Sequence, residues 1–209
     1  MTARSPGRAT HLLLRRRRAI ARRGIDILEQ KALALAREQR RLRHHVAETR
    51  LAWEDASRDA DRWFLRAAVI GAEQQFELIR SLVGAATRTD VRWRSTMGVA
   101  YPAQTRLDLA GTAGIASLGR SSALVPAASA YRRAVTAALD NAAANRALHL
   151  VDEELAITQR RLRALAHRWL PQLERSLHEV ELSLAEQERE DMVRARWVSG
   201  RRSSGTGRP

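Results

Sequence analysis

The 209-residue sequence contains no cysteine, and aromatic residues make up only 4% of it. The absence of cysteine excludes a disulfide framework and a zinc site built on thiolates. Few aromatic side chains argue against a thick globular core, but two helices packed along a narrow interface do not need many. Proline is absent from residues 11–86, so this stretch can form one very long helix.

Long apolar runs are missing as well. The least charged stretch, residues 107–131, is interrupted by charged residues, glycines and Pro126. It falls short of the roughly 20 apolar residues that a membrane span needs, so we expect no membrane insertion. The segment Gly111–Gly114 lacks the Gly-Lys-Ser/Thr ending of a phosphate-binding loop, and the histidines have no metal-ligand spacing. We therefore expect no catalytic, metal, cofactor or direct nucleotide site.

Positive charge is abundant, with a formal net charge of +14 that comes almost entirely from arginine, because Lys31 is the only lysine. Such a chain favours an acidic partner. The run Arg15–Arg18 could bind nucleic acid, but four consecutive residues on a helix point in four directions and no RNA-binding signature accompanies them. A basic coiled-coil arm that binds nucleic acid is the alternative to the function inferred below.

Two stretches at opposite ends of the chain carry a seven-residue apolar repeat, which is typical of a coiled coil. In the N-terminal stretch the repeat comprises Leu14, Ala21, Ile25, Leu28, Leu35, Leu42, Val46 and Trp53. In the C-terminal stretch it comprises Leu148, Val151, Leu155, Leu162, Leu165, Trp169, Leu173, Leu177, Val180 and Leu184. We call these residues the expected seam, and we expect both tryptophans to lie in it as core residues.

These repeats predict an all-α fold, a long antiparallel two-helix coiled-coil hairpin with a small central β-hairpin and loop region. Apolar pairing favours Leu42 near Leu165 or Trp169, and Trp53 near Leu155. The apolar positions shift after Trp169, and Pro171 predicts a kink or register change just before it.

The middle of the chain alternates apolar with polar or small residues, which predicts a short β-hairpin. Its central residues are Met97, Gly98, Val99, Tyr101 and Pro102. Because this segment lies outside both repeats, its removal is expected to leave the coiled coil intact. The expected organisation is a disordered lead-in over 1–10, helices over 11–86 and 127–198, a hairpin and loop region over 87–126, and a disordered tail over 199–209.

Three segments resemble one family in their order and spacing. They are Pro6-Gly7-Arg8 with the arginines that follow up to Lys31, then Met97–Pro102, and then Arg160–Leu165 with Leu170–Glu174 and Glu186–Glu190. Together they resemble the D subunit of the V-type (archaeal/vacuolar-type) ATPase and ATP synthase. The chain departs from that family at Arg163–Ala166, where the family commonly has Asn-Ala-Leu-Glu.

The resemblance implies a non-catalytic central rotor shaft. Its implied partners are the catalytic and regulatory hexamer subunits (A and B type), a small rotor subunit (F type) and a funnel subunit linked to the membrane rotor ring. It implies a cytoplasmic location, peripheral on the inner face of the cell membrane. The basic surface expected to face the hexamer comprises Arg15, Arg16, Arg22, Arg23, Arg189, Arg194 and Arg196.

Overall fold

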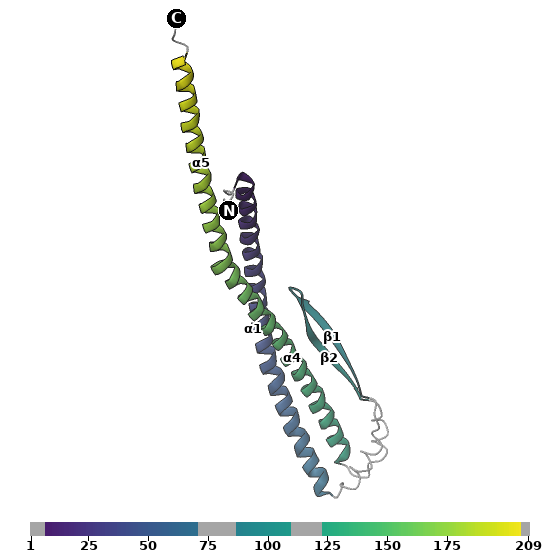
Figure 1. The fold of residues 1–209 in the computed structure, drawn as a ribbon. Helices are drawn as coiled ribbons and strands as arrows, with labels where there is room; N and C mark the ends of the chain where they lie inside the picture. Colours follow the sequence, from purple (N-terminus) through teal and green to yellow (C-terminus); the bar gives the residue numbers. More distant parts are fainter. Residues whose placement is uncertain (1–6, 71–86, 110–122, 206–209) are drawn as a thin grey trace, which may run out of the picture. The chain divides into compact units, whose positions relative to one another are not determined.

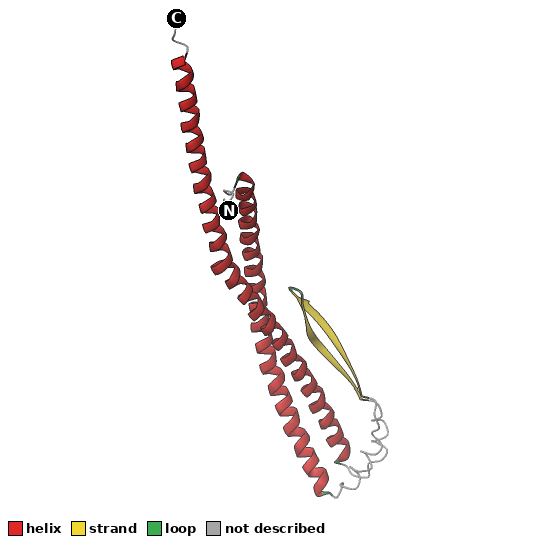
Figure 2. Ribbon diagram, in the orientation of Figure 1, coloured by secondary structure: helices red, strands yellow, loops and turns green. Residues whose placement is uncertain are grey.

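The computed structural model describes residues 7–70, 87–109 and 123–205, with side chains up to residue 197 in the last range. The first helix, α1, spans Arg8–Val69, and the strands β1 (Thr87–Thr96) and β2 (Val99–Leu109) follow it. Helix α4 (Leu124–Ala164) continues through the π-helical turn η2 (Leu165–Trp169) into α5 (Leu170–Gly205), as Figure 1 shows. The expected helical hairpin with a small two-stranded sheet is confirmed (Figure 2).

The helix ends differ from the expected boundaries. Helix α1 begins at Arg8, inside the expected lead-in, and the Gly7 carbonyl accepts a bond from the Thr10 amide at 2.8 Å. Helix α4 begins at Leu124, because Pro126 in the first turn has no amide that needs a partner. Helix α5 runs to Gly205, so the expected disorder from residue 199 is wrong up to that point. Serine and glycine weaken a helix that is already nucleated but do not end it.

Parts of the expected organisation lie outside the described residues. These parts are residues 71–86 of the N-terminal helix, most of the loop over 110–122, and the chain ends at 1–6 and 206–209.

The chain divides into two compact units. The terminal unit contains residues 1–30 and 158–209, and the central unit contains residues 31–157. Within each unit a stretch of α1 runs antiparallel to a stretch of the C-terminal helices.

The core of the central unit is built along the helix pair. One cluster joins Leu35 and Leu42 of α1 to Ala147, Val151 and Leu155 of α4. Two further clusters, between the C-terminal half of α1 and the N-terminal part of α4, consist mainly of small residues. Their members are Ala56, Ala60, Trp63, Ala67, Ala123, Leu124, Ala130 and Ala134. Ala56 and Trp63 continue the heptad position of Leu35 and Leu42, and Ala60 and Ala67 continue that of Val46 and Trp53. The seam therefore extends farther than we expected.

The β-hairpin is longer than the sequence indicated. Its strands pair from Thr87↔Leu109 to Thr96↔Val99, with a register shift between Arg92 and Trp93. Met97 and Gly98 form the tight turn with φ of 51° and 83°. Two consecutive residues with positive φ are the requirement of a type I′ turn, whose twist matches that of the two strands. Pro102 is tolerated inside β2 because it lies at the bulge, opposite Trp93.

Candidate functional site

The expected seam residues fall into three groups by burial. Seven are buried: Ala21, Leu35, Leu42, Val151, Leu155, Leu177 and Val180. Nine are half-buried: Leu14, Ile25, Leu28, Val46, Leu148, Leu162, Leu165, Leu173 and Leu184. Trp53 and Trp169 are exposed by 39% and 59%, so the expectation that they are core residues is wrong. Occupying a heptad position therefore does not by itself bury a side chain in the helix pair.

The expected pairing register is also wrong. Leu42 shares a cluster with Ala147 and Val151, whereas we expected it near Leu165 or Trp169. Leu165 instead lies beside Gly24, where an added Cβ would come within 3.3 Å of Leu165 Cδ2. Val151 lies two heptads before Leu165 in the sequence, so the observed register differs from the expected one by two heptads. A shift by whole heptads keeps apolar residues opposite one another, so the apolar pattern alone could not distinguish the two registers.

Polar contacts across the helix pair of the central unit fix the observed register. Lys31 Nζ lies 2.6 Å from Glu154 Oε1, and Gln39 Nε2 donates to Asp152 Oδ1 at 2.7 Å. These partners would be separated by any heptad slip. Gln39 occupies a seam position, and a polar residue at such a position specifies register at some cost in stability.

Three polar contacts join the helices of the terminal unit. Arg22 pairs with Glu174 at 2.8 Å, His11 lies 3.2 Å from Glu181, and Arg8 pairs with Glu188 at 3.4 Å. Along these three contacts the residue number on α5 increases while the residue number on α1 decreases, as antiparallel packing requires. Beyond Glu188, α5 continues over residues 189–205 past the first residue of α1 (Figure 1).

The π-helical turn explains why Trp169 leaves the seam. The amide of Leu170 bonds to the carbonyl of Leu165, five residues back. An unbroken heptad from Leu162 and Leu165 would place residues 169 and 172 on the seam, but both are exposed. Leu170 and Leu173, one residue later, are half-buried instead. A π-turn takes up one extra residue, so it shifts the heptad by one. The register change expected just before Pro171 is therefore present.

This explanation predicts the effect of single-residue deletions. Deleting His167 should convert the π-turn to regular α-helix and leave the seam in phase on both sides. The midpoint of thermal unfolding should then stay near that of the unchanged chain. Deleting the exposed Arg146 instead puts the buried residues after it out of phase. That should destabilise the chain by an amount comparable to a large core truncation, roughly 2–5 kcal/mol. Equal losses from both deletions, measured by circular dichroism on heating, would contradict the explanation.

The β-hairpin is anchored to the central unit by Tyr101. The side chain of Tyr101 is fully buried in the cluster that contains Leu35, Leu42 and Val151. Its hydroxyl donates to Glu38 Oε1 at 2.6 Å and lies 3.0 Å from the Thr96 hydroxyl. The expectation that removal of the hairpin would leave the coiled coil intact overlooked this contact, because removal takes a fully buried side chain out of the cluster. Tyr101 follows the turn by three residues, but nothing in the sequence indicates that it points into the seam.

Glu38 is held in its charged form by its neighbours. Hydrogen bonds from Arg41 lower the pKa of the Glu38 carboxyl below its ordinary value of 4.5, and the bond from Tyr101 acts in the same direction. Partial burial raises the pKa and is the second-largest influence after the bonds from Arg41, but the net shift of the pKa is downward. A carboxyl whose pKa is depressed by folding stabilises the fold above its unfolded pKa. That stabilisation disappears as the pH falls through the folded-state pKa.

Replacing Glu38 with glutamine should therefore have a pH-dependent effect. At neutral pH we expect a loss of about 1 kcal/mol, because charge-assisted hydrogen bonds to Tyr101 and Arg41 are weakened. Below about pH 4.5 the difference should shrink, since the original carboxyl becomes protonated as well. Glu29→Gln removes an exposed carboxylate of α1 and serves as the control. Urea unfolding at several pH values tests this, and a pH-independent difference would contradict it.

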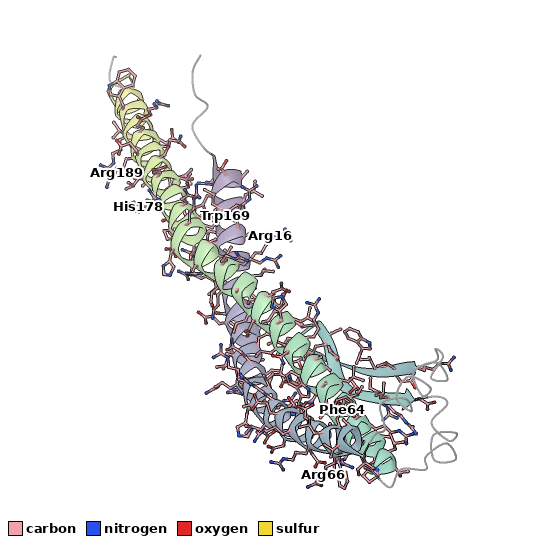
Figure 3. All side chains as sticks on the ribbon, turned by 90° about the horizontal axis from the view of Figure 1, so that it is seen from below. Arg16, Phe64, Arg66, Trp169, His178 and Arg189 are labelled. Carbon is pink, nitrogen blue, oxygen red and sulfur yellow. The ribbon has the colours of Figure 1, made fainter. Side chains whose placement is uncertain are left out.

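The expected basic surface is exposed throughout. Some of its arginines bind carboxylates of the same chain. Arg22 joins α1 to α5, Arg189 pairs with Glu186 at 3.5 Å, and Arg194 pairs with Glu190 at 3.2 Å. Within the part of the chain that the structure describes, Arg15, Arg16 and Arg23 form no ion pair; Figure 3 labels Arg16 and Arg189. The role of this surface toward a partner stays a prediction.

An exposed apolar stripe accompanies these arginines on α1, and our sequence analysis missed it. Leu13, Ile20 and Ile27 are exposed by 59%, 63% and 58%. They are spaced by seven residues, each directly before a seam position. Since residues one heptad apart lie on one helix face, the three form a second line beside the seam. The sequence contains the signal for this stripe, because a large apolar residue directly precedes each of the seam residues Leu14, Ala21 and Leu28.

Within residues 7–70, 87–109 and 123–205, no three histidine, aspartate or glutamate side chains gather closely enough to hold a metal ion. In the same residues, no helix is both long enough and apolar enough to span a bilayer.

Comparison with known proteins gives a consistent family. The sequence profile that describes the D subunit of ATP synthase matches residues 10–200. The chain belongs to this ATP synthase D-subunit family. The D subunit of the A-type ATP synthase of Methanopyrus kandleri is 31% identical over 196 residues, which cover 93% of this chain and 84% of the relative. The D subunit of the V-type ATP synthase of Anaeromyxobacter dehalogenans is 29% identical over 188 residues, covering 88% and 90%.

A eukaryotic relative extends this range. The D subunit of the V-type proton ATPase of Suberites domuncula is 25% identical over 195 residues, covering 92% of this chain and 78% of the relative. The family match includes the helical hairpin, the β-hairpin and most of α5. The resemblance inferred from the sequence is confirmed, and the chain is a subunit of the rotary ATPase type.

Proposed function

We propose that this protein is the non-catalytic central-stalk rotor of a V/A-type rotary ATPase or ATP synthase. In that role it transmits torque between the catalytic hexamer and the membrane rotor, during ATP synthesis or ATP-driven ion transport. The observation that carries the proposal is the antiparallel helix pair with polar cross-links, found in a member of the D-subunit family. A two-helix pair transmits torque only if its helices resist sliding past each other.

Two features of the helix pair oppose sliding. Interdigitated side chains such as Leu35, Leu42 and Val151 would have to leave their places before one helix could move by a heptad. Polar contacts, such as Lys31 with Glu154 and Arg22 with Glu174, would have to break as well. Surface ion pairs are individually weak, so we assign most of the resistance to the buried seam.

The proposed partners are the A- and B-type subunits of the hexamer, a small F-type rotor subunit and a funnel subunit below. The exposed stripe of Leu13, Ile20 and Ile27, with Arg16 and Arg23 beside it, suits contact with the hexamer. The protein would be peripheral, on the inner face of the membrane that holds the rotor ring.

A rotation assay tests the proposal. The chain is assembled with its A-, B- and F-type partners, the hexamer is fixed to a surface, and a bead is attached to this chain. We expect ATP to turn the bead in one direction. An assembled complex that hydrolyses ATP while the bead stays fixed to the hexamer would show that the chain is a stator, and would overturn the proposal.

Nucleic-acid binding remains the alternative, because Arg15, Arg16 and Arg23 form no ion pair within the described residues. Fluorescence anisotropy with random single-stranded and duplex DNA distinguishes the two functions. Tight binding at physiological salt, with a steep loss as salt rises, would favour the alternative. The rotor proposal expects only weak binding under these conditions.

A further inference from the structure

A groove lies between the β-hairpin and the helices of the central unit. It has a volume of 960 Å³ and is open to solvent along its side. Helices α1 and α4 contribute the apolar side chains of Leu42, Ala143, Ala144 and Ala147 to its floor, and the polar side chains of Arg41, His45, Thr49 and Asp140 beside them. Asp90 and residues 92–94 of β1, with residues 101–106 of β2, form its wall, and Figure 3 shows the hairpin beside the helices. No part of the family assignment or of the proposed rotor function requires this groove.

The groove carries more positive than negative charge. Four arginines line it, Arg41, Arg92, Arg94 and Arg106, against two aspartates, Asp90 and Asp140. Arg41 is already paired with Glu38, and Asp140 accepts a hydrogen bond from Thr105. Among the described residues, Arg92 and Arg106 form no side-chain hydrogen bond or ion pair and are exposed. Two guanidinium groups at the rim are therefore available to an incoming ligand.

We propose that this groove docks an acidic, apolar-faced segment of a partner protein. The floor of alanines lets a polypeptide approach closely, and Trp93, exposed by 63%, offers an aromatic anchor at the edge. The arginines are spread along both strands, which suits carboxylates distributed along a peptide. The partner is taken to belong to the same complex, and only that detail rests on the proposed function.

Other occupants fit the groove less well. A nucleic acid would bring phosphates close to Asp90 and Asp140, and Trp93 is the single exposed aromatic side chain among the residues that line the groove, so it cannot stack successive bases. A second copy of this chain would bring a net charge of +14 toward arginines of the same sign. Charge complementarity therefore selects an acidic protein segment.

Photo-crosslinking in the cell of origin tests the proposal on the full chain. Gln104 lines the groove, and its replacement by p-benzoylphenylalanine puts a reactive group there. We expect one main adduct after irradiation, with mass spectrometry placing it on a partner segment that contains several Asp or Glu residues next to apolar ones. The double variant R92E/R106E should lower the yield of that adduct by about tenfold or more.

The control is the double variant R37E/R43E. Both arginines are exposed on α1 in the central unit, do not line the groove, and change the net charge by the same amount. This variant should keep the adduct, which separates docking in the groove from a general effect of charge. Circular dichroism checks that both variants keep the helical content of the unchanged chain.

Each outcome decides the inference. No adduct from position 104, an adduct to nucleic acid, an adduct to a segment without acidic residues, or equal loss in both double variants would overturn it. If the adduct is lost only in R92E/R106E but the captured acidic segment belongs to no rotary ATPase component, the groove proposal stands and the assignment of its partner to the same complex fails. If the complex assembles and turns without an adduct, the rotor proposal stands alone.

Discussion

Replacing Leu42 with aspartate should unfold the central unit or bring it close to unfolding. Leu42 is 2% exposed and belongs to the cluster that joins α1, α4 and Tyr101 of the β-hairpin. An aspartate there loses the burial of an aliphatic side chain and places a carboxylate among apolar atoms without a counter-charge. We expect a loss of about 4 kcal/mol or more, which is a large share of the stability of an ordinary domain.

The matched control is Leu33→Asp. Leu33 lies on the same helix and is 53% exposed, so the same chemical change leaves the carboxylate in water. We expect this variant to lie within about 0.5 kcal/mol of the unchanged chain. Thermal and urea unfolding followed by circular dichroism measure both. If Leu33→Asp destabilised the chain as much as Leu42→Asp, the assignment of the seam to the face that contains Leu42 would be wrong.

The helical hairpin could be predicted because the heptad repeat determines which face of each helix is buried. Leu35, Leu42, Val151 and Leu155 were all recognised in this way, and they form the core of the central unit. The register could not be predicted, because shifting one helix by two heptads opposes the same kinds of side chain. Contacts such as Gln39 with Asp152 decide it, and a polar pair more than a hundred residues apart has no signature in one sequence.

The two tryptophans show where a periodic pattern stops being sufficient. Trp53 lies at a seam position, yet its side chain is 39% exposed, whereas Trp63 packs against the alanine cluster that contains Ala60. Trp169 is displaced by the π-turn that begins at Leu165. Pro171 signalled a register change, yet it could not show that the change would take up one residue and bring Leu170 onto the seam.

The β-hairpin was predicted from the alternation of apolar with polar or small residues on both sides of Met97 and Gly98, which form its turn in the structure. Its attachment was missed, since Tyr101 reads equally well as an exposed strand residue. Only the three-dimensional structure brings its hydroxyl to Glu38, 63 positions earlier in the chain. The groove beside the hairpin depends on the same attachment, so it could not be inferred from the sequence either.

The largest functional effect is expected from shortening α5. A chain that stops after Glu188 loses residues 189–205, the part of α5 beyond the first residue of α1, together with the last four residues. It keeps the pairs of Arg8 with Glu188 and His11 with Glu181, and it keeps the seam residues Leu177 and Val180. We therefore expect the shortened chain to fold with nearly unchanged thermal stability.

In the assembled complex the same truncation should remove most ATP-driven ion transport and weaken retention of the rotor. Under the rotor proposal, the chain ends are the part of the shaft inside the hexamer. The deletion takes away the exposed side chains of Arg189, Arg194, Arg196, Met192 and Val193, and with them the surface that would face the hexamer. Removing residues through Arg23 as well should deepen the loss, because the basic and apolar surface of α1 then disappears too.

A chain that stops after Gly205 is the control, since it retains all of α5, and it should behave like the full-length protein. Co-purification of the rotor, ATP hydrolysis and ion transport into vesicles are measured for each complex. Hydrolysis that continues while transport falls would mean that the hexamer still turns over without driving the membrane rotor, as a shortened axle predicts. Full transport by the chain that stops after Glu188 would show that residues 189–205 carry no torque, and the contact with the hexamer would have to lie elsewhere on the helix pair.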